Sequence, residues 1–147
     1  MTGPLQLRLD AARLDDLARI RSFVREGARS FGASAEAADD LVIAVDEAAT
    51  NVIRHGYGGD PGPIVVEVVR EGPGVVVRLV DDAPVFDPTG RPSPDLDEPL
   101  ESRPFGGMGI HLMRVSVDRI APRRVGRSGN DLTFFKDLVS QERSVAE

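Results

Sequence analysis

Hydrophobic and polar positions recur at helical spacing through the first part of the chain. Residues 14–31 place apolar side chains among charged ones with this period, which predicts an amphipathic helix with a solvated face. A second helix is predicted from Ser34, which can cap its N-terminus, to about His55, with Gly56 as the stop signal. Because residues 5–55 hold few Gly and Pro, we expect this whole segment to be helical.

Strand patterns follow the helices. Two short β-branched runs, Ile64–Val69 and Val75–Val80, are joined by a Glu-Gly-Pro-Gly turn. They predict a hairpin of two central strands that are covered on most of both faces. A second hairpin is predicted near the end of the chain, with strands at 123–127 and 131–138 around a Ser-Gly-Asn turn.

Between the hairpins the chain first loses its periodicity and then regains it. Residues 82–107 are rich in Pro, Gly, Asp and Glu, and a loop of this length inside a compact domain is usually functional. Residues 110–120 return to helical spacing and predict a third helix. Residues 139–147 are predicted to form a frayed tail.

The predicted order is helix, helix, strand, strand, long loop, helix, strand, strand. Helices grouped apart from mainly antiparallel strands predict an α+β fold, a two-layer α/β sandwich with the helices on one face of the sheet. No repeat or linker interrupts the sequence. We therefore expect a single domain over residues 1–147.

Composition excludes several classes of protein. The chain has 18 Lys+Arg and 24 Asp+Glu, a net charge of -6, which argues against a nucleic acid bound through its phosphates. Because Cys is absent, disulfides, Cys-zinc sites, iron–sulfur clusters and thiol nucleophiles are excluded, and two His argue against a His-built metal site. No run approaches the ~18 apolar residues of a membrane span, and the N-terminus lacks a signal-peptide core. These features predict a soluble cytoplasmic protein.

The second predicted helix carries the first candidate site. Glu47, Asn51 and His55 follow one another at intervals of four residues, so they share one face. A carboxylate and a carboxamide one turn apart make an oxygen-donor pair suited to Mg²⁺ and to orienting a hydroxyl. A polar surface stripe has the same spacing, and spacing alone favours that interpretation.

Two further candidates lie outside this helix. Asp81 ends a buried strand and can accept hydrogen bonds from a ligand there, although alone it fits a turn residue better. Gly106–Gly109 lies where a loop enters a helix, a place whose free N–H groups bind phosphate, although many helix entries contain glycine. It is not a P-loop, because no Gly-Lys-Ser/Thr follows, nor a Rossmann fingerprint, because no βαβ unit surrounds it.

Together these motifs resemble the Bergerat-fold (GHKL) ATP-binding domains. Within that superfamily the chain is most similar to the anti-sigma-factor serine kinases of bacterial partner-switching systems, the SpoIIAB and RsbW type. The most specific stretch is Ile43–Tyr57, which reads IAVDEAATNVIRHGY. Asp81 at a strand end, Gly107-Met-Gly109 before a helix and Asn130-Asp-Leu-Thr133 in the last strand complete a pattern that spans nearly the whole chain.

The resemblance implies a role for each motif. Asn51 would coordinate the Mg²⁺ that bridges the ATP phosphates, and Glu47 would be the general base for a partner protein's serine or threonine hydroxyl. Asp81 would accept a hydrogen bond from the adenine amino group, and Thr133 would place a hydroxyl near the adenine. Arg19 would face the partner protein.

The resemblance implies an ATP lid over residues 84–105. Gly107-Met108-Gly109, where the lid would run into the following helix, would wrap the phosphates. One departure from the family lies before it. The usual D-x-G-x-G pattern reads Asp-Asp-Ala-Pro-Val here, so that Ala83 and Val85 replace both glycines. A left-handed Ala83 would cost about 1–2 kcal/mol, and its methyl group could crowd the adenine. We therefore expect weakened nucleotide affinity at the site to which Ala83 belongs.

The function implied is that of a serine/threonine protein kinase that uses Mg-ATP to phosphorylate a STAS-domain anti-sigma-factor antagonist. It would also sequester a sigma factor or an equivalent regulator. The alternative is a non-catalytic or weakly nucleotide-binding module that sequesters its partner. A histidine kinase is disfavoured, because the chain lacks a dimerisation helix pair with a phosphoacceptor His.

The expected partners are proteins, with no nucleic acid and no membrane among them. The oligomeric state stays open, with a homodimer as one option. Because the chain is acidic, an acidic partner would need a local basic patch. We expect that patch on the first helix, at Arg19, Arg21 and Arg25.

Overall fold

The computed structural model describes residues 3–83 and 129–138, and it describes 119–124 as a strand. The predicted lid, the glycine motif at 106–109, most of the third predicted helix and the predicted tail lie outside the described residues. The single-domain prediction stays a prediction. No helix in the described part of the chain is long and apolar enough to cross a membrane.

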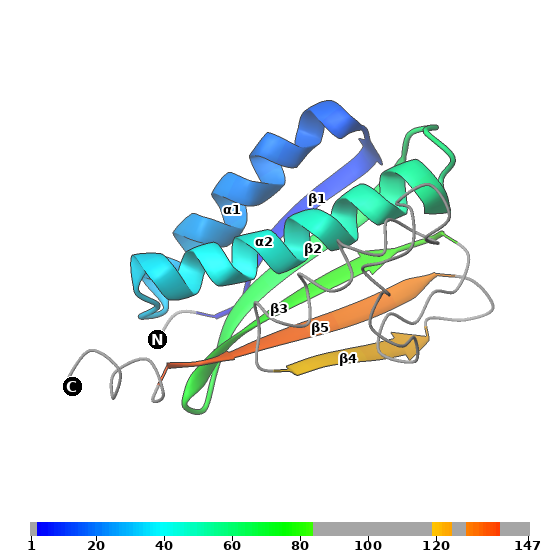
Figure 1. Ribbon diagram of the computed structural model, residues 1–147. Coiled ribbons are helices and arrows are strands. Elements are labelled where there is room, and N and C mark those ends of the chain that lie inside the picture. Colours follow the sequence, from blue (N-terminus) through cyan, green and yellow to red (C-terminus); the bar gives the residue numbers. More distant parts are fainter. Residues whose placement is uncertain (1–2, 84–118, 125–128, 139–147) are drawn as a thin grey trace, which may run out of the picture.

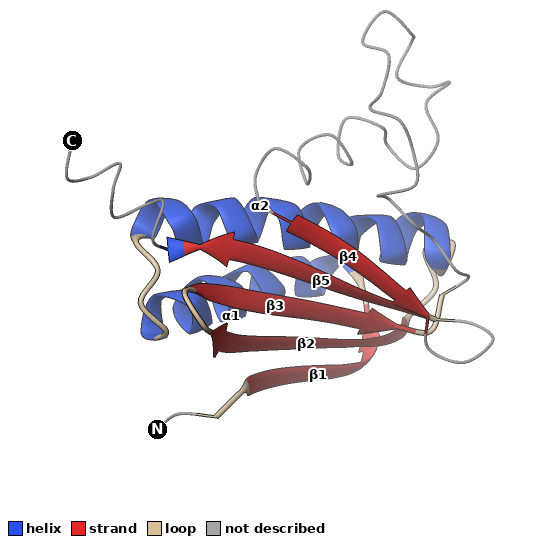
Figure 2. Cartoon of the chain, turned by 90° about the horizontal axis from the view of Figure 1, so that it is seen from below, coloured by secondary structure: helices blue, strands red, loops and turns tan. Residues whose placement is uncertain are grey.

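Five strands form one antiparallel sheet in the order β1-β2-β3-β5-β4 (Figure 2). Both long helices lie on one face of this sheet (Figure 1), as the predicted two-layer α+β fold requires. The strands are β1 (Leu5–Ala12), β2 (Gly62–Glu71), β3 (Gly74–Asp81), β4 (Arg119–Arg124) and β5 (Asn130–Asp137). The helices are α1 (Leu17–Ser30), after a short 3-10 turn at Leu14–Asp16, and α2 (Ala35–Asn51), before a π-helical turn η2 at Val52–Gly56.

The hydrophobic core lies between the helices and the inner face of the sheet. Alternate residues of β2 and β3 are buried against the helices, as the period of two in a strand requires. An apolar stripe of α2 is buried as well, at Leu41, Ala44, Val45 and Ala48, and α1 contributes Ile20 and Val24. The predicted hairpin is confirmed, because β3 pairs with β2 along the whole length of β3 and both strands have neighbours on each side.

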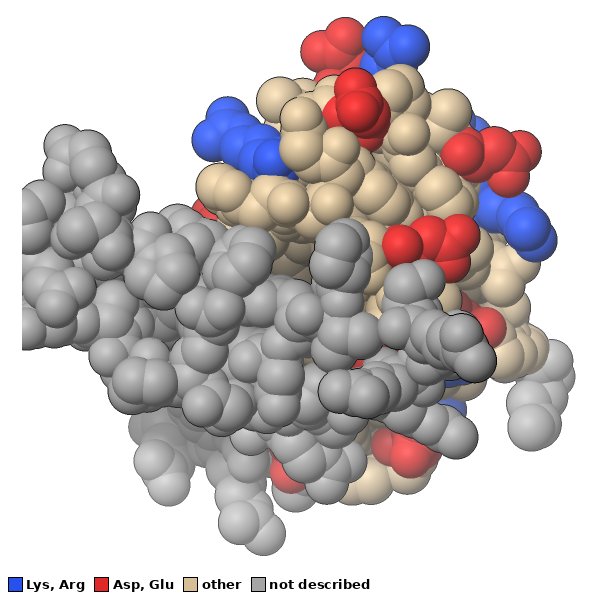
Figure 3. All heavy atoms as spheres, turned by 90° about the vertical axis from the view of Figure 1, so that its right-hand side faces the viewer, with Lys and Arg blue, Asp and Glu red and all other residues tan. Residues whose placement is uncertain are grey.

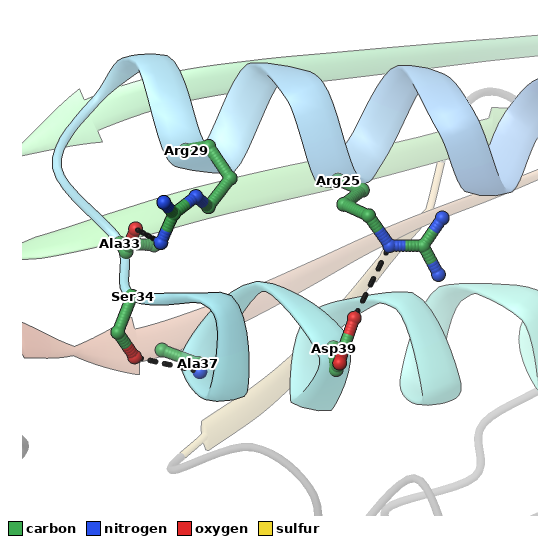
Figure 4. Close-up of polar contacts among 6 residues, drawn as sticks. All are labelled: Arg25, Arg29, Ala33, Ser34, Ala37 and Asp39. Atoms are coloured by element: carbon green, nitrogen blue, oxygen red, sulfur yellow. Dashed lines mark hydrogen bonds and ion pairs between the residues drawn. The ribbon is translucent and has the colours of Figure 1, made fainter.

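The connection between the helices is fixed by polar contacts (Figure 4). The Ser34 hydroxyl accepts a hydrogen bond from the backbone N–H of Ala37 at 3.1 Å, which is the predicted N-cap of α2. Arg29 of α1 donates to the Ala33 carbonyl, and Arg25 pairs with Asp39 of α2 at 3.1 Å.

Replacing Ser34 by Ala is expected to lower the free energy of unfolding by about 1 kcal/mol, because one N–H of the first turn loses its partner. Chemical denaturation of the purified variant measures this change. Ala35 of the same turn is exposed and makes a matched control as Ala35→Ser, which should change stability by less than half as much. Equal stability of Ser34→Ala and the native chain would contradict the cap.

The expectation of a wholly helical segment at 5–55 is wrong at its beginning, where β1 forms. Leu5, Leu7 and Leu9 alternate with polar residues, a period of two that the scarcity of Gly and Pro does not reveal. Leu9 is buried, and β1 pairs antiparallel with β2 from Leu5 to Ala12, with one irregularity. Long-range pairing with β2 therefore decides the structure of this segment.

The second predicted hairpin is confirmed with one strand shifted. β5 begins at Asn130, one residue before the predicted strand, and pairs with both β3 and β4. β4 occupies 119–124 rather than 123–127, so the predicted third helix is wrong at Arg119 and Ile120. Ile120 pairs with Phe134 of β5, which places it in the sheet.

Candidate functional site

Three elements bring the predicted site residues to one end of the molecule. The C-terminal end of α2, the C-terminal end of β3 and the N-terminal end of β5 all lie there (Figure 1). Asp81, the last residue of β3, is the register partner of Asn130, the first residue of β5. The π-helical turn after α2 packs on the same place, because Gly56 lies against Ala83.

Asp81 is a buried carboxylate with one oxygen bound and one oxygen unpaired. Its exposed fraction is 3%. Oδ1 accepts hydrogen bonds from the Ala83 backbone N–H at 2.8 Å and from the Asn130 Nδ2 at 2.9 Å. Oδ2 is buried and has no hydrogen-bond partner among the described residues. A buried acceptor without a donor is costly, so this oxygen is suited to a ligand's N–H group.

Burial raises the pKa of Asp81, while the hydrogen bonds from Asn130 and Ala83 lower it and the charge of Asp82 raises it. A carboxyl group with a raised pKa in the folded state stabilises the fold when protonated, and that contribution is lost as the pH rises through the raised pKa. The ionised, unliganded Asp81 therefore costs stability near neutral pH. A ligand that donates to Oδ2 would recover part of this cost.

Asn51 is the last residue of α2 and is also buried, with an exposed fraction of 6%. Its Nδ2 has no hydrogen-bond partner among the described residues. The surface-stripe interpretation fails for Asn51, because a surface carboxamide would be hydrated. A carboxamide kept buried and unpaired is instead suited to a ligand or a hydrated ion.

Glu47 lies one helical turn before Asn51 and is half-buried. Burial raises the pKa of Glu47, the neighbouring charge of Asp46 raises it further, and Arg54 lowers it. Asp46 is itself held by Arg21 of α1 at 2.9 Å. A carboxylate whose pKa is raised is a stronger base than an ordinary glutamate, as a proton acceptor for a hydroxyl requires.

The Ala83 methyl group lies on the helix side of this end of the sheet. Ala83 is 2% exposed, and a Cβ placed on Gly56 would lie 2.5 Å from the Ala83 Cβ. The space left by Gly56 in the π-helical turn therefore accommodates the methyl group that replaces the motif glycine. Both backbone groups of Ala83 are hydrogen-bonded. Its N–H donates to Asp81 Oδ1 at 2.8 Å, and its carbonyl accepts from the Gly129 N–H at 2.8 Å.

Replacing Gly56 by Ala is expected to destabilise the fold by about 1–3 kcal/mol, because two methyl groups would compete for one space. Adding Ala83→Gly to this variant should recover most of the loss, while Ala83→Gly alone should change stability by less than ~1 kcal/mol. Thermal and chemical denaturation of the four proteins measures the coupling between the two positions. Additive effects of the two substitutions would contradict this contact.

Tyr57 fastens the end of the π-helical turn to the sheet. Its hydroxyl donates to the Pro63 carbonyl and accepts from the Asp82 backbone N–H at 2.8 Å. Its ring lies over Gly62, where an added Cβ would come within 2.6 Å. Tyr57 therefore links β2 to the residue that follows Asp81.

The structure does not bring Thr133 to Asp81. Thr133 pairs with Arg78, while the flanking residues Leu132 and Phe134 are buried against the helices. Strand alternation therefore places Thr133 on the opposite face of the sheet from Asp81. The residue of β5 that contacts Asp81 is Asn130, which the sequence motif contains but which was given no role.

The remaining predicted residues either lie outside the described part of the chain or are exposed on the helices. Gly107, Met108 and Gly109 fall outside the described residues, so their predicted contacts with phosphate stay predictions. His55 is exposed on the π-helical turn, and Arg19 is exposed on α1.

The basic patch expected on α1 is largely neutralised. Arg21 pairs with Asp46 and Arg25 with Asp39, which leaves Arg19 as the member without an ion pair among the described residues. Figure 3 looks onto the end of the molecule that holds the site. In its described part, acidic and basic side chains are interspersed rather than gathered by sign.

This geometry fits a nucleotide with a metal ion. A buried acceptor at Asp81 suits the amino group of a base. At Asn51 the unpaired Nδ2 is a donor that suits a phosphate oxygen, and the oxygen of the same carboxamide suits Mg²⁺. Among the described residues no group of three or more His, Cys, Asp or Glu could hold a metal ion alone.

An antiparallel sheet with both helices on one face is consistent with the α+β fold of a GHKL-type ATPase domain. The sequence profile of the histidine kinase-like ATPase domain matches residues 11–136. The chain belongs to this family, which confirms the predicted GHKL membership.

The chain is similar to curated proteins named serine-protein kinase RsbW, the type to which the sequence motifs point. Serine-protein kinase RsbW of Bacillus cereus (strain G9842) is 27% identical over 113 residues, which cover 74% of this chain and 71% of the relative. Serine-protein kinase RsbW of Listeria monocytogenes serotype 4a (strain HCC23) is 35% identical over 94 residues, which cover 60% of each protein. The alignment thus leaves two fifths of the Listeria relative unmatched. The names of both relatives support the anti-sigma-factor kinase branch.

Proposed function

We propose that this chain is a cytoplasmic serine/threonine protein kinase that uses Mg-ATP in a bacterial partner-switching system. Its substrate would be a small STAS-type anti-sigma-factor antagonist, and its second partner a sigma factor or equivalent regulator. The observation that carries the proposal is two buried polar atoms at one end of the fold, Asn51 Nδ2 and Asp81 Oδ2, which have no hydrogen-bond partner within the described part of the chain. Names of the relatives support the reaction class.

Each residue would have one task in the reaction. Asp81 would hold the base through Oδ2, and Asn51 would hold the metal ion against the phosphates. When bound, Mg-ATP supplies the phosphoryl group and the positive charge that offsets its oxygens. Glu47 would take the proton of the partner's hydroxyl as that oxygen bonds to the γ-phosphorus and the bond to ADP breaks.

The position of Glu47 supports its role as the base. It precedes Asn51 by one helical turn, so both side chains leave the same face of α2. Its raised pKa strengthens it as a proton acceptor while leaving it ionised once the pH exceeds that pKa. Phosphoryl transfer depends mainly on positioning and charge, so a single acid with metal and backbone donors suffices.

The non-catalytic alternative rests on Ala83 and Val85, which replace both motif glycines, and Val85 lies outside the described residues. Because the Ala83 methyl group packs against Gly56, it does not by itself argue against a nucleotide at this end of the sheet. A sequestering module that dispenses with nucleotide would also have no use for two unpaired polar atoms in its interior. These points favour a nucleotide-binding protein over a nucleotide-free module, and the names of the relatives favour a kinase among nucleotide-binding proteins.

The test is phosphosite mapping in an extract of the cells that carry this protein. The extract is incubated with ATP and either the purified native chain or its Glu47→Gln variant, and phosphopeptides are compared by mass spectrometry. The proposal predicts a new phosphoserine or phosphothreonine on a small partner protein with the native chain only. Identical phosphopeptides in both samples would contradict it.

A further inference from the structure

Asn130 is a buried polar residue for which the proposed reaction has no direct use. It opens β5 opposite Asp81 and is 5% exposed. Burying a carboxamide is unfavourable unless its hydrogen bonds are made. Its contacts with the neighbouring strand therefore indicate what it does.

Those contacts concern Asp81 and the residue two positions after it. Asn130 Nδ2 donates to Asp81 Oδ1 at 2.9 Å and lies 3.4 Å from the Ala83 carbonyl oxygen. The Ala83 N–H donates to the same Oδ1 at 2.8 Å. Two donors thus occupy Oδ1, and only Oδ2 is left for a ligand.

We propose that Asn130 is a positioning residue that makes the site selective for bases carrying an amino group, because it holds Asp81 with Oδ2 as the only acceptor presented. This inference rests on the proposed nucleotide binding and adds the residue that sets its selectivity. An ionised carboxylate can only accept hydrogen bonds. A base with a carbonyl oxygen in place of the amino group would therefore leave two buried acceptors facing each other, which is unfavourable.

A positioning role for Asn130 can be told from a purely structural one, because its loss would change the preference between bases and not only the stability of the fold. Without Nδ2, Oδ1 keeps one donor, and the carboxyl group can turn or take up a proton. A protonated Asp81 would have an O–H that can donate to a carbonyl. Loss of Asn130 should therefore reduce discrimination between bases, whereas loss of a merely structural contact should reduce only stability.

Adenosine and inosine triphosphates make the matched probes, because they differ by an amino group against a carbonyl oxygen at one ring position. Dissociation constants for both are measured by calorimetry with Mg²⁺, for the native chain, Asn130→Leu, Asn130→Ala and Thr133→Val. We expect the native chain to prefer ATP by ~10-fold or more, which corresponds to about 1.4 kcal/mol. Both Asn130 variants should lower this preference to threefold or less, mainly by weakening ATP.

The outcomes separate this inference from the proposed function. If the native chain binds ATP and a folded Asn130 variant keeps the full preference, the inference is overturned while nucleotide binding stands. If the native chain binds neither nucleotide, both fall. If Thr133→Val lowers the preference as the Asn130 variants should, the assignment of the β5 faces is overturned. Unfolding of each variant is followed by circular dichroism, so that Asn130→Ala serves if Asn130→Leu does not fold.

Discussion

The Glu47→Gln variant is expected to transfer phosphate about 10²–10⁴-fold more slowly than the native chain, because an amide cannot take the hydroxyl proton. Its affinity for Mg-ATP should stay within about threefold, since Glu47 is assigned to the hydroxyl and not to the nucleotide. Transfer is measured as phosphorylation of the partner identified by phosphosite mapping, and affinity by calorimetry.

Two comparisons sharpen the Glu47 prediction. Glu36→Gln makes the same chemical change at an exposed site in the first turn of α2 and should leave the rate unchanged. Because burial raises the pKa of Glu47, the rate of the native chain should also rise with pH through that raised pKa, where the carboxyl group loses its proton. A Glu47→Gln rate within threefold of the native rate would exclude Glu47 as the base.

The Asn51→Leu variant is expected to be more stable than the native chain and to bind Mg-ATP far more weakly. An apolar side chain removes the unpaired Nδ2, whose burial costs about 1–3 kcal/mol, so the free energy of unfolding should rise by ~1 kcal/mol. Loss of the metal ligand should weaken Mg-ATP on the order of 100-fold, or about 2.7 kcal/mol. Chemical denaturation and calorimetry measure the two changes.

The opposite signs of these two effects are what mark a ligand-binding residue. The neighbouring Thr50→Val provides the control, because its hydroxyl bonds back to the Asp46 carbonyl at 2.7 Å within α2. That variant should lose a little stability and keep its nucleotide affinity. If Asn51→Leu destabilises the chain and binds ATP like the native protein, Asn51 is a structural residue.

Local sequence patterns correctly predict the α2 helix and the β2–β3 hairpin. The α2 helix has a cap at Ser34 and a continuous apolar stripe, and the β2–β3 hairpin has two β-branched runs around one turn. Strand β1 is missed because its signal is only three alternating leucines and its pairing partner lies more than fifty residues away. Ile120 is missed for a different reason, because a helical pattern in the sequence gives way to pairing with Phe134 of β5.

Some residues of the candidate site can be predicted from the sequence, and others can be assigned only from the structure. Asn51, Glu47 and Asp81 are singled out in the sequence by the family resemblance, because spacing alone favours a surface stripe or a turn at these positions. Asn130 and Thr133 cannot be separated without the register of β5, because a shift of three residues along a strand reverses the face. The accommodation of Ala83 by Gly56 joins residues far apart in the chain, and only the packed structure shows it.

The central claim is that the end of α2 and the ends of β3 and β5 bind Mg-ATP. Isothermal titration of the purified chain with ATP, in the presence of Mg²⁺ and again with the metal chelated, tests it directly. The account predicts saturable binding of one ATP per chain that weakens when the metal is removed and weakens on the order of 100-fold in Asn51→Leu. Absence of saturable binding, or binding that Asn51→Leu and chelation leave unchanged, would contradict it.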